Sequence, residues 1–382
     1  MEFFNSFIHA LVVAIVGLGM WVTLTLGTLS SNIVVVKNNL SVPNTNTPTA
    51  TSTAAATNTT TTTPKKVVAL PVTKKDPTPV PQTPPPAAQA PIVITDDIIS
   101  QANASARAAL VNILCTFRTA NTSSYISGSG VIVDPRGVIL TNAHVAQFFL
   151  LQNYISPGST SCVIRAGSPA VAQYQATLLY LPPKWIATNA SQIISQQATG
   201  TGERDYAFLY ITGPSQFGPA LPSSSPALNI SIANPKQGDP VLLAGYPAGF
   251  LDGNEIQRNL YVSSAVSKIG QLYTFDSATH VDVVSLGGTV VSQSGSSGGA
   301  VINLATGNLA GLIATESEGT TTASRDLRAI TMSHINSSLQ EDGKGSIVSL
   351  LSGDLAAIAK EFNTDAAPAL TKQLVDAIEG RK

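Results

Sequence analysis

The sequence predicts an all-β globular region that lies between a non-globular N-terminal part and a helical C-terminal end. Thr, Ser, Gly, Ala and Val dominate the 382 residues, a composition that suits strands joined by many turns. Between residues 109 and 331, short Val/Ile/Leu runs recur with Gly, Pro or Asn between them, which is typical of a barrel or a sandwich. After Met332 the apolar residues recur at helical spacing instead.

The charge of the chain is low and nearly balanced. The formal net charge is −1 and only 11% of the residues are charged, so no basic surface is expected and nucleic acid is excluded as a partner. No H-E-x-x-H or C-x-x-C pattern occurs, so we expect no metal and no cofactor. The sequence does not specify an oligomeric state.

Residues 1–36 are expected to form an N-terminal tail and a transmembrane helix. Phe7 to Leu29 contain no Asp, Glu, Lys or Arg, and a membrane-spanning helix needs roughly 20 such residues. A cleaved signal peptide is the competing interpretation. Glu2, the lack of Lys or Arg before the apolar run and the lack of an A-x-A site favour an uncleaved anchor.

Residues 37–92 are expected to form a disordered linker. The segment is first Thr-rich, at Thr59 to Thr63, and then Pro-rich from Pro77 to Pro86, and such composition cannot bury a core. About 50 residues at ~3.1 Å each reach on the order of 150 Å. The expectation is a membrane-anchored protein whose domain is extracytoplasmic, in a periplasm or at a cell surface, or secreted where the first segment is cleaved.

The globular domain is expected over residues 93–340, and a C-terminal helical segment over 341–382. Thr95-Asp96-Asp97 is a helix-start pattern before the first strand. In the last segment, apolar residues recur every three or four positions, at Ile347, Leu350, Leu351, Leu355, Ile358 and Phe362, and again after Pro368. These helices are expected to pack on the surface of the β-domain or to close it off.

Three of the four histidines lie in the globular part, and His144 has the most informative surroundings. Residues 128–145 read as a strand, a tight turn at Asp134–Gly137, a second strand, and a histidine where that strand ends. A strand end holds a general base rigidly at the rim of a scaffold. Taken alone, a structural histidine is the commoner interpretation.

Ser297 lies in Gly295-Ser296-Ser297-Gly298-Gly299-Ala300. A nucleophilic hydroxyl needs backbone N–H groups aimed at the developing oxyanion, and glycine at 295 permits a turn that directs the amides of Gly295 and Ser297 to one point. Taken alone, the motif is also an ordinary Ser/Gly-rich loop.

Asp205 stands at the start of an apolar strand. A buried carboxylate there can accept the second imidazole N–H and fix the tautomer of the ring. Glu203 is a weaker substitute, and a strand-capping aspartate is the structural alternative. The order His, Asp, Ser within one β-rich region strengthens the assignment of His144, Asp205 and Ser297 as a catalytic triad.

Several stretches resemble the trypsin-like serine proteases, particularly the Deg/HtrA branch, over about residues 105–340. They are Gly128–Val145, Asp205–Ile211, Gly238–Pro247 and Ser297–Leu312. The resemblance implies two six-stranded antiparallel barrels of the chymotrypsin type with the triad in the cleft between them. It implies a serine endopeptidase that acts on proteins or peptides through an acyl-enzyme.

The same resemblance places the base of the specificity pocket at Val291 and its wall at Ala314 and Thr315. An apolar base favours small or medium apolar side chains. Glu316 and Glu318 follow the wall strand, and they leave a basic residue open as the alternative.

The sequence departs from the Deg/HtrA pattern in two places. Thr188–Gly202 reads as an inserted surface loop, and fewer than 50 residues follow Asn336, too few for a PDZ domain.

The two cysteines, Cys115 and Cys162, form one disulfide if the domain lies outside the cytosol, and two buried thiols are the other interpretation.

Two other functions are alternatives to the peptidase. The motif at Ser297 also fits G-x-S-x-G, and Asp326 and His334 follow it in the order of an α/β-hydrolase, but that fold needs alternating strands and helices. The second is a protease-like domain that keeps the fold, has no activity, and binds peptides or a partner protein.

Overall fold

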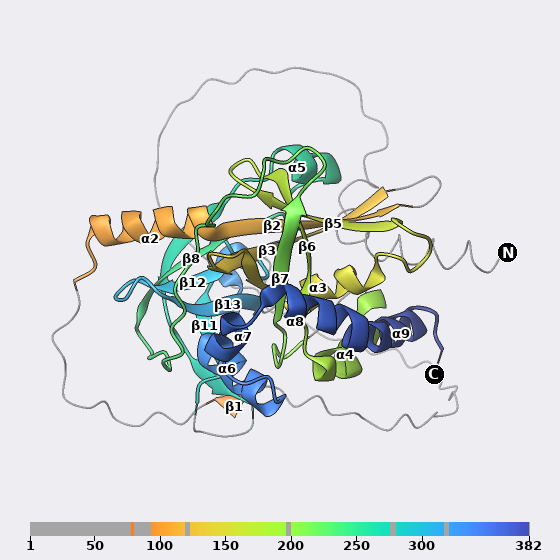
Figure 1. Cartoon of the computed structure of the whole chain (residues 1–382). Helices are drawn as coiled ribbons and strands as arrows, with labels where there is room; N and C mark the ends of the chain where they lie inside the picture. Colours follow the sequence, from red (N-terminus) through yellow and green to blue (C-terminus); the bar gives the residue numbers. More distant parts are fainter. Residues whose placement is uncertain are drawn as a thin grey trace, which may run out of the picture. The chain divides into compact units, whose positions relative to one another are not determined.

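The computed structural model of the chain describes residues 78–79, 93–118, 123–195, 200–275, 280–316 and 321–381 (Figure 1). The predicted transmembrane segment and all of the predicted linker except Thr78–Pro79 lie outside these residues. Within the described ranges, no helix combines the length and the apolar character that a membrane span requires.

The first sheet is a closed six-stranded barrel, as the sequence predicts. Its strands are connected in the order β2-β3-β4-β7-β6-β5, and every neighbouring pair is antiparallel. Ile113, Ile139 and Leu209 are completely buried in it. The bounds are β2 (Leu110–Arg118), β3 (Ser123–Asp134), β4 (Val138–Thr141), β5 (Thr160–Ala166), β6 (Val171–Tyr180) and β7 (Ala207–Pro214).

The second sheet corrects the prediction of a second closed six-stranded barrel. It is an open, curled half-barrel of eight strands in the order β1-β10-β11-β14-β13-β12-β8-β9. Its strands are β1 (Thr78–Pro79), β8 (Pro240–Gly245), β9 (Ser263–Lys268), β10 (Leu272–Thr274), β11 (Val283–Gly287), β12 (Ala300–Asn303), β13 (Leu309–Glu316) and β14 (Leu327–Thr331).

The half-barrel stays open because the chain after β9 occupies the edge of β11 on which β9 would have to pair. Gly270 N–H donates to Ser285 O at 2.7 Å, and Ser285 N–H donates to Gln271 O at 2.8 Å. β10 then continues along the same edge. Strand β9 does not pair with β11, and the Ser267 hydroxyl of β9 donates to Leu286 O of β11 at 2.7 Å. In a closed barrel, backbone hydrogen bonds would join β9 to β11, whereas here a side-chain hydrogen bond connects them.

Helix α2 (Asp96–Ala109) begins where the sequence predicts. The Thr95 hydroxyl accepts from Ile98 N–H and caps the first turn, and Asp96 and Asp97 lie at the positive end of the helix dipole. The small side chains of Ala102, Ala106 and Ala109 form its buried face. Because these alanines are small, α2 packs closely on β8 and β3.

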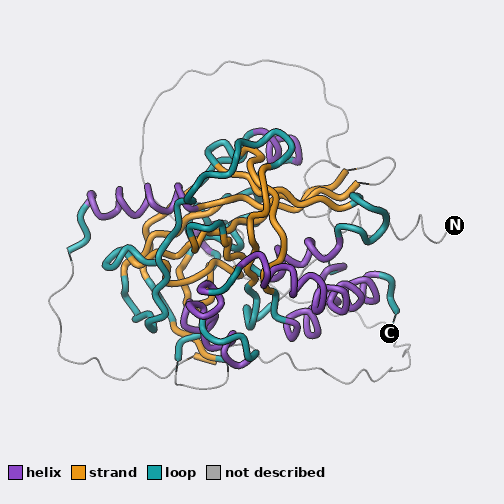
Figure 2. The backbone as a smooth tube through the Cα atoms, viewed as in Figure 1, coloured by secondary structure: helices purple, strands orange, loops and turns teal. Residues whose placement is uncertain are grey.

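The C-terminal helices are confirmed (Figure 2). Helix α6 packs on β13 and β14 of the second sheet, and the later helices α8 and α9 lie on the first barrel and the short helices beside it. Helix α8 packs on β6 and β7, and α9 packs on α4 and on the short helices η1 and η2. The bounds are α6 (Met332–Glu341), α7 (Ile347–Ser352), α8 (Leu355–Glu361), the π-helix η4 (Phe362–Ala366) and α9 (Ala367–Ile378). The remaining short elements are α3 (Ala143–Ala146), η1 (Gln147–Leu151), α4 (Pro183–Asn189), η2 (Ala190–Ile194), α5 (Gly253–Arg258) and η3 (Thr322–Ser324).

The segment predicted as an inserted surface loop begins within a helix rather than a loop. Thr188 lies in α4, and η2 follows directly. Both elements pack against α9, so this part of the segment forms a layer with the C-terminal helices.

Cys115 and Cys162 form a disulfide. They are directly opposite each other on the neighbouring strands β2 and β5. The structure therefore supports the first of the two interpretations, and the bond joins two strands of the closed barrel that are 47 residues apart in sequence.

Candidate active site

His144 and Asp205 form a directly hydrogen-bonded pair at one end of the closed barrel. The His144 ring Nδ1 lies 2.7 Å from Asp205 Oδ2, and the His144 backbone N–H donates to Asp205 Oδ1 at 2.9 Å. His144 lies in α3, just after β4, and Asp205 lies two residues before β7, the strand beside β4. The carboxylate side chain is 7% exposed and the imidazole 37%, so the ring has an open edge toward solvent.

The pairing sets the protonation behaviour of His144. Burial lowers the pKa of the imidazole, but the charge of Asp205 and its hydrogen bond raise it by more, so the pKa lies above its usual 6.5. With the Nδ1 proton held by Asp205, Nε2 of the neutral ring is the atom left to accept a proton.

The loop that carries Ser297 is docked on the first barrel by Ser129 of β3. The Ser129 backbone N–H donates to Ser297 O at 2.7 Å, and its hydroxyl donates to Gly295 O at 2.7 Å. The same hydroxyl accepts from Tyr246 N–H at 2.9 Å. One serine of the closed barrel thus holds both the loop that carries Ser297 and the residue that follows β8.

Gly298 is required by this docking. Its φ is +85°, and a Cβ there would lie 2.0 Å from Ser129 O and 2.5 Å from Thr141 Oγ1. Thr141 ends β4, three residues before His144. The loop after Ser297 therefore lies against the strand end from which the His144 helix starts.

The two amides predicted to bind an oxyanion are available. Gly295 has a φ of +93°, the left-handed turn that the sequence predicts at this position. Neither its N–H nor that of Ser297 donates to a backbone acceptor in the described part of the chain. The Ser297 side chain is partly buried, and the described hydrogen bonds include none between its hydroxyl and the His144 ring. Such bonds commonly form only when substrate is bound.

The predicted pocket residues lie on β13 and in the segment between β11 and β12 of the second sheet. Val291 is completely buried in the apolar core of the half-barrel, with Val241 and Leu243. Ala314 is 6% exposed on β13, and the side chain of Thr315 lies outside the described part. Of the two glutamates, Glu318 lies outside the described residues, as does the side chain of Glu316.

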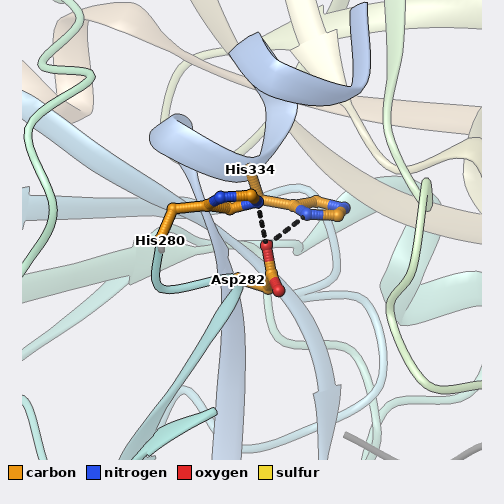
Figure 3. A group of neighbouring side chains, drawn as sticks. All are labelled: His280, Asp282 and His334. Atoms are coloured by element: carbon orange, nitrogen blue, oxygen red, sulfur yellow. Dashed lines mark hydrogen bonds and ion pairs between the residues drawn. The ribbon is translucent and has the colours of Figure 1, made fainter. Parts of the chain in front are cut away.

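A second histidine–aspartate cluster was not predicted. Asp282 Oδ1 lies 2.8 Å from His334 Nδ1 and 3.1 Å from His280 Nε2, and all three residues point toward one another (Figure 3). Asp282 Oδ2 accepts from the Thr274 hydroxyl and from Phe275 N–H. His280 and Asp282 are adjacent to β11 while His334 lies in α6, so no local motif could have shown the cluster.

The residue types in this cluster fit a divalent metal, since three ligand atoms lie within 4.8 Å of one another. The hydrogen bonds do not fit one. The backbone N–H of Arg204 donates to His334 Nε2 at 3.4 Å, so the proton of the neutral ring lies on Nδ1 and is donated to Asp282. A protonated Nδ1 has no lone pair for a metal, and we assign the cluster as a hydrogen-bonded network.

Asp282 is held as an anion by this network. Burial raises the pKa of its carboxyl, but the hydrogen bonds from His334, Phe275 and Thr274 oppose this, and the pKa lies below its usual 3.8.

The cluster also bears on the hydrolase alternative. His334 pairs with Asp282 rather than with Asp326, whose Oδ1 instead accepts from the Ser285 hydroxyl. The acid and the base that this alternative requires are therefore not paired with each other.

Comparison with known proteins gives a family match and similar solved structures. Residues 128–312, which include His144, Asp205 and Ser297, match a family described as the trypsin-like peptidase domain. A comparison with curated proteins gives no match. Among solved structures, the chain is similar to the active form of the Rv3671c protease from M. tuberculosis, at 17% identity and a TM-score of 0.39 over 70% of this chain and 100% of that one. An inactive alanine mutant of the same protease gives 18% identity and a TM-score of 0.38, over 68% and 96% of the two chains.

The sequence match covers strands of the closed barrel and of the half-barrel, and it includes both halves of the site. Among the described residues, no PDZ domain follows the half-barrel, and the C-terminal helices stand in its place. Residues 128–312 therefore match the trypsin-like peptidase domain, and the described part of the chain has a chymotrypsin-like fold, built from one closed barrel and one curled half-barrel.

Proposed function

We propose that the protein is a serine endopeptidase that cleaves peptide bonds through an acyl-enzyme, with Ser297 as nucleophile, His144 as general base and Asp205 as its partner. The observation that supports this most strongly is the doubly hydrogen-bonded His144–Asp205 pair, beside a loop whose amides at 295 and 297 are free to donate.

The proposed reaction follows from the chemistry of these groups. Nε2 of His144 accepts the hydroxyl proton as Ser297 Oγ attacks the scissile carbonyl carbon. The carbonyl oxygen becomes an oxyanion, and the N–H groups of Gly295 and Ser297 stabilise it. His144 then protonates the leaving amine, and the ester at Ser297 is hydrolysed by a water that His144 activates in turn. Asp205 stabilises the imidazolium in both steps without becoming protonated itself.

The proposed substrates are proteins or peptides with a small or medium apolar residue before the cleaved bond. The buried Val291 and the nearly buried Ala314 support this preference, because an apolar pocket base leaves a charged side chain without a partner. A panel of peptides that differ only at this residue tests it, and preferred cleavage after Lys or Arg would contradict it.

We further propose that residues 7–29 anchor the protein in a membrane and that the peptidase domain is extracytoplasmic. The uncharged apolar run supports the anchor, and the disulfide fits an oxidising compartment. Deletion of residues 1–36 should release the domain from membranes. Deletion of 41–76, an equal length of the linker, should leave it attached, and release by both deletions would contradict the anchor.

Labelling with a fluorophosphonate, followed by peptide mapping, tests the nucleophile. The adduct is expected on Ser297. Ser297→Ala should abolish labelling and lower turnover of peptides by on the order of 10⁶. Ser296→Ala is the matched control: this neighbouring hydroxyl is buried and has no hydrogen-bond partner, so the variant should still be labelled.

The same experiment distinguishes the binding-module alternative. A folded wild-type protein that acquires no adduct and hydrolyses no peptide would favour a protease-like domain without activity. Hydrolysis that survives in Ser297→Ala would contradict the assignment of the nucleophile.

A further inference from the structure

Arg204, the residue before Asp205, has an unusual backbone conformation. Its φ is +56°, and among the described residues it is the only non-glycine with a positive φ. The turn around it is tight: Asp205 N–H donates to Gly202 O at 3.1 Å, and Tyr206 N–H donates to Arg204 O at 2.9 Å. A conformation of this kind persists only where surrounding contacts impose it.

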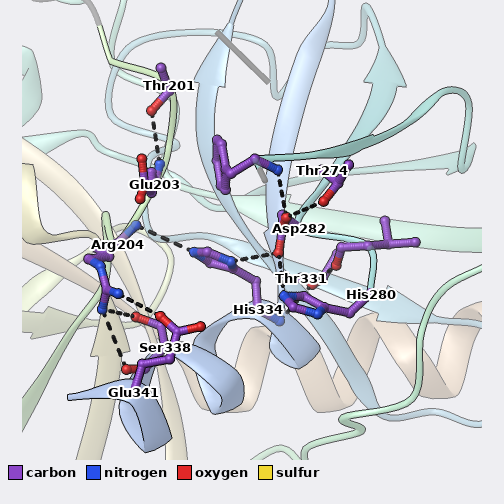
Figure 4. Close-up of polar contacts among 12 residues, drawn as sticks. Thr201, Glu203, Arg204, Thr274, His280, Asp282, Thr331, His334, Ser338 and Glu341 are labelled. Carbon is purple, nitrogen blue, oxygen red and sulfur yellow. Dashed lines mark hydrogen bonds and ion pairs between the residues drawn. The ribbon is translucent and has the colours of Figure 1, made fainter. Parts of the chain in front are cut away.

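Helix α6 supplies those contacts (Figure 4). His334, in its first turn, accepts the Arg204 backbone N–H at 3.4 Å. Near the C-terminal end of α6, the Arg204 guanidinium donates to Ser338 Oγ and Asp342 Oδ1 at 2.9 Å and to Glu341 Oε2 at 2.6 Å. The Arg204 side chain is only 13% exposed, so these are partly buried, charge-assisted bonds.

The acceptors of these bonds are themselves fixed. His334 is oriented by its bond to Asp282, and the ring of Phe275 packs against it with ring centroids 5.1 Å apart. Ser338 Oγ accepts from the Tyr206 hydroxyl, and Asp342 accepts from the Tyr180 hydroxyl, both at 3.0 Å. The cluster around Asp282 and the C-terminal end of α6 thus both hold the turn around Arg204, one through its backbone and the other through its side chain.

That turn leads directly to the catalytic pair. Asp205 accepts two hydrogen bonds from His144 through its carboxylate, and its backbone oxygen accepts from Asn142 Nδ2 at 2.8 Å. A shift of the backbone at 204 therefore moves the carboxylate relative to the imidazole. Misplacement of a catalytic group by about 1 Å costs on the order of 10² in rate.

We infer that helix α6 positions the carboxylate of Asp205 against His144, and that it acts through Arg204 and His334. Neither residue contacts substrate in this role, so both are positioning residues. The claim that these residues contribute to catalysis rests on the proposed function. The claim that they hold Asp205 against His144 can be tested without any substrate.

The direct readout is the pKa of His144, measured by NMR titration of the histidine rings in the full-length protein. Asp205 raises this pKa, so a displaced carboxylate lowers it. We expect a lower His144 pKa in Arg204→Ala and in His334→Leu. His334→Gln should restore much of the wild-type value, because an amide can accept from Arg204 and donate to Asp282.

The matched control is Arg136→Ala. Arg136 also ties a turn of the first barrel to the C-terminal helices, by donating to Leu351 O and to Gly353 O, but its turn carries no catalytic residue. This variant should leave the His144 pKa unchanged.

If Arg204→Ala does not fold, Arg204→Lys replaces it. A lysine cannot hold all three acceptors at once, so a smaller shift in the same direction is expected.

Activity is the second readout. In Arg204→Ala, kcat should fall by on the order of 10² while KM changes little, since the substrate contacts are intact. A folded Arg204 variant in which His144 titrates as in the wild type would overturn the inference. A lowered His144 pKa in a protein that hydrolyses no peptide would support the positioning and contradict the proposed function instead.

Discussion

The backbone N–H of Ser129 donates to the carbonyl oxygen of Ser297 at 2.7 Å, and this bond links the closed barrel to the half-barrel at the proposed nucleophile. The histidine and the aspartate come from the closed barrel, while the serine comes from the half-barrel. The site is therefore complete only when the two sheets dock in one arrangement, and the contacts around Ser129 define that arrangement.

Gly298→Ala should disrupt this docking. The new methyl group would lie 2.0 Å from Ser129 O, so the loop must move away from the first barrel. We expect a loss of at least about 10² in kcat/KM, because a small misplacement of the nucleophile is enough for that.

The variant Gly307→Ala distinguishes the effect of the steric clash at position 298 from the effect of placing an alanine at a positive φ. Gly307 also has a positive φ, +71°, but nothing lies within 4 Å of a Cβ placed there. This variant should lose roughly 1–2 kcal/mol of stability from the left-handed conformation alone, and it should keep its kcat/KM. Equal losses of activity in the two variants would contradict the docking role of Gly298.

Asp205→Asn tests the role of the carboxylate. An amide at this position cannot stabilise the imidazolium, and it favours the wrong tautomer of His144. Replacement of a triad aspartate by asparagine costs about 10⁴ in kcat in serine proteases, and a similar loss is expected here. Steady-state hydrolysis of a peptide substrate measures it, and a loss below tenfold would contradict the assignment.

The pH dependence of kcat/KM reports the pKa of His144 in the free enzyme. The imidazole must be neutral to accept the Ser297 proton, so activity falls as the pH falls through this pKa. Because Asp205 raises the pKa, the acidic limb should lie above pH 6.5. In Asp205→Asn the limb should move to lower pH. A profile that is flat from acid to neutral pH would contradict an imidazole base.

The residues of the candidate site could be selected from the sequence, because they lie in motifs that local physics explains. A strand-turn-strand followed by His144, a carboxylate at a strand start and a Gly-flanked Ser297 each need only neighbouring residues to be recognised. The short apolar runs of most barrel strands are equally local. Strand β6 has a mixed pattern instead, with Tyr174, Ala176, Leu178 and Tyr180 at alternate positions.

The unpredicted features depend on contacts between distant residues. His280 and His334 are 54 positions apart in the sequence, and only the pairing of β11 with β14 and the start of α6 bring them to Asp282. The open half-barrel results from competition between β9 and β10 for one edge, which a strand pattern does not reveal. The strained Arg204 has no signal in the sequence, since arginine is not a residue that favours a positive φ.

The disulfide should contribute to the stability of the closed barrel. Removal of a native disulfide typically costs about 2–5 kcal/mol. We expect a loss of that size in the variant with both Cys115→Ala and Cys162→Ala, measured by denaturant unfolding. Intact mass with and without reductant should differ by two hydrogens, and equal masses would show free thiols instead.

If His144 is the base that activates Ser297, its removal must slow the reaction of that serine with a fluorophosphonate. The second-order rate constant for modification of Ser297 should be measured in the wild-type protein and in folded His144→Ala. A general base contributes about 10²–10⁴ to such a step, and we predict a decrease in that range. Modification at the wild-type rate without the imidazole would show that the hydroxyl at 297 and the ring at 144 do not act together.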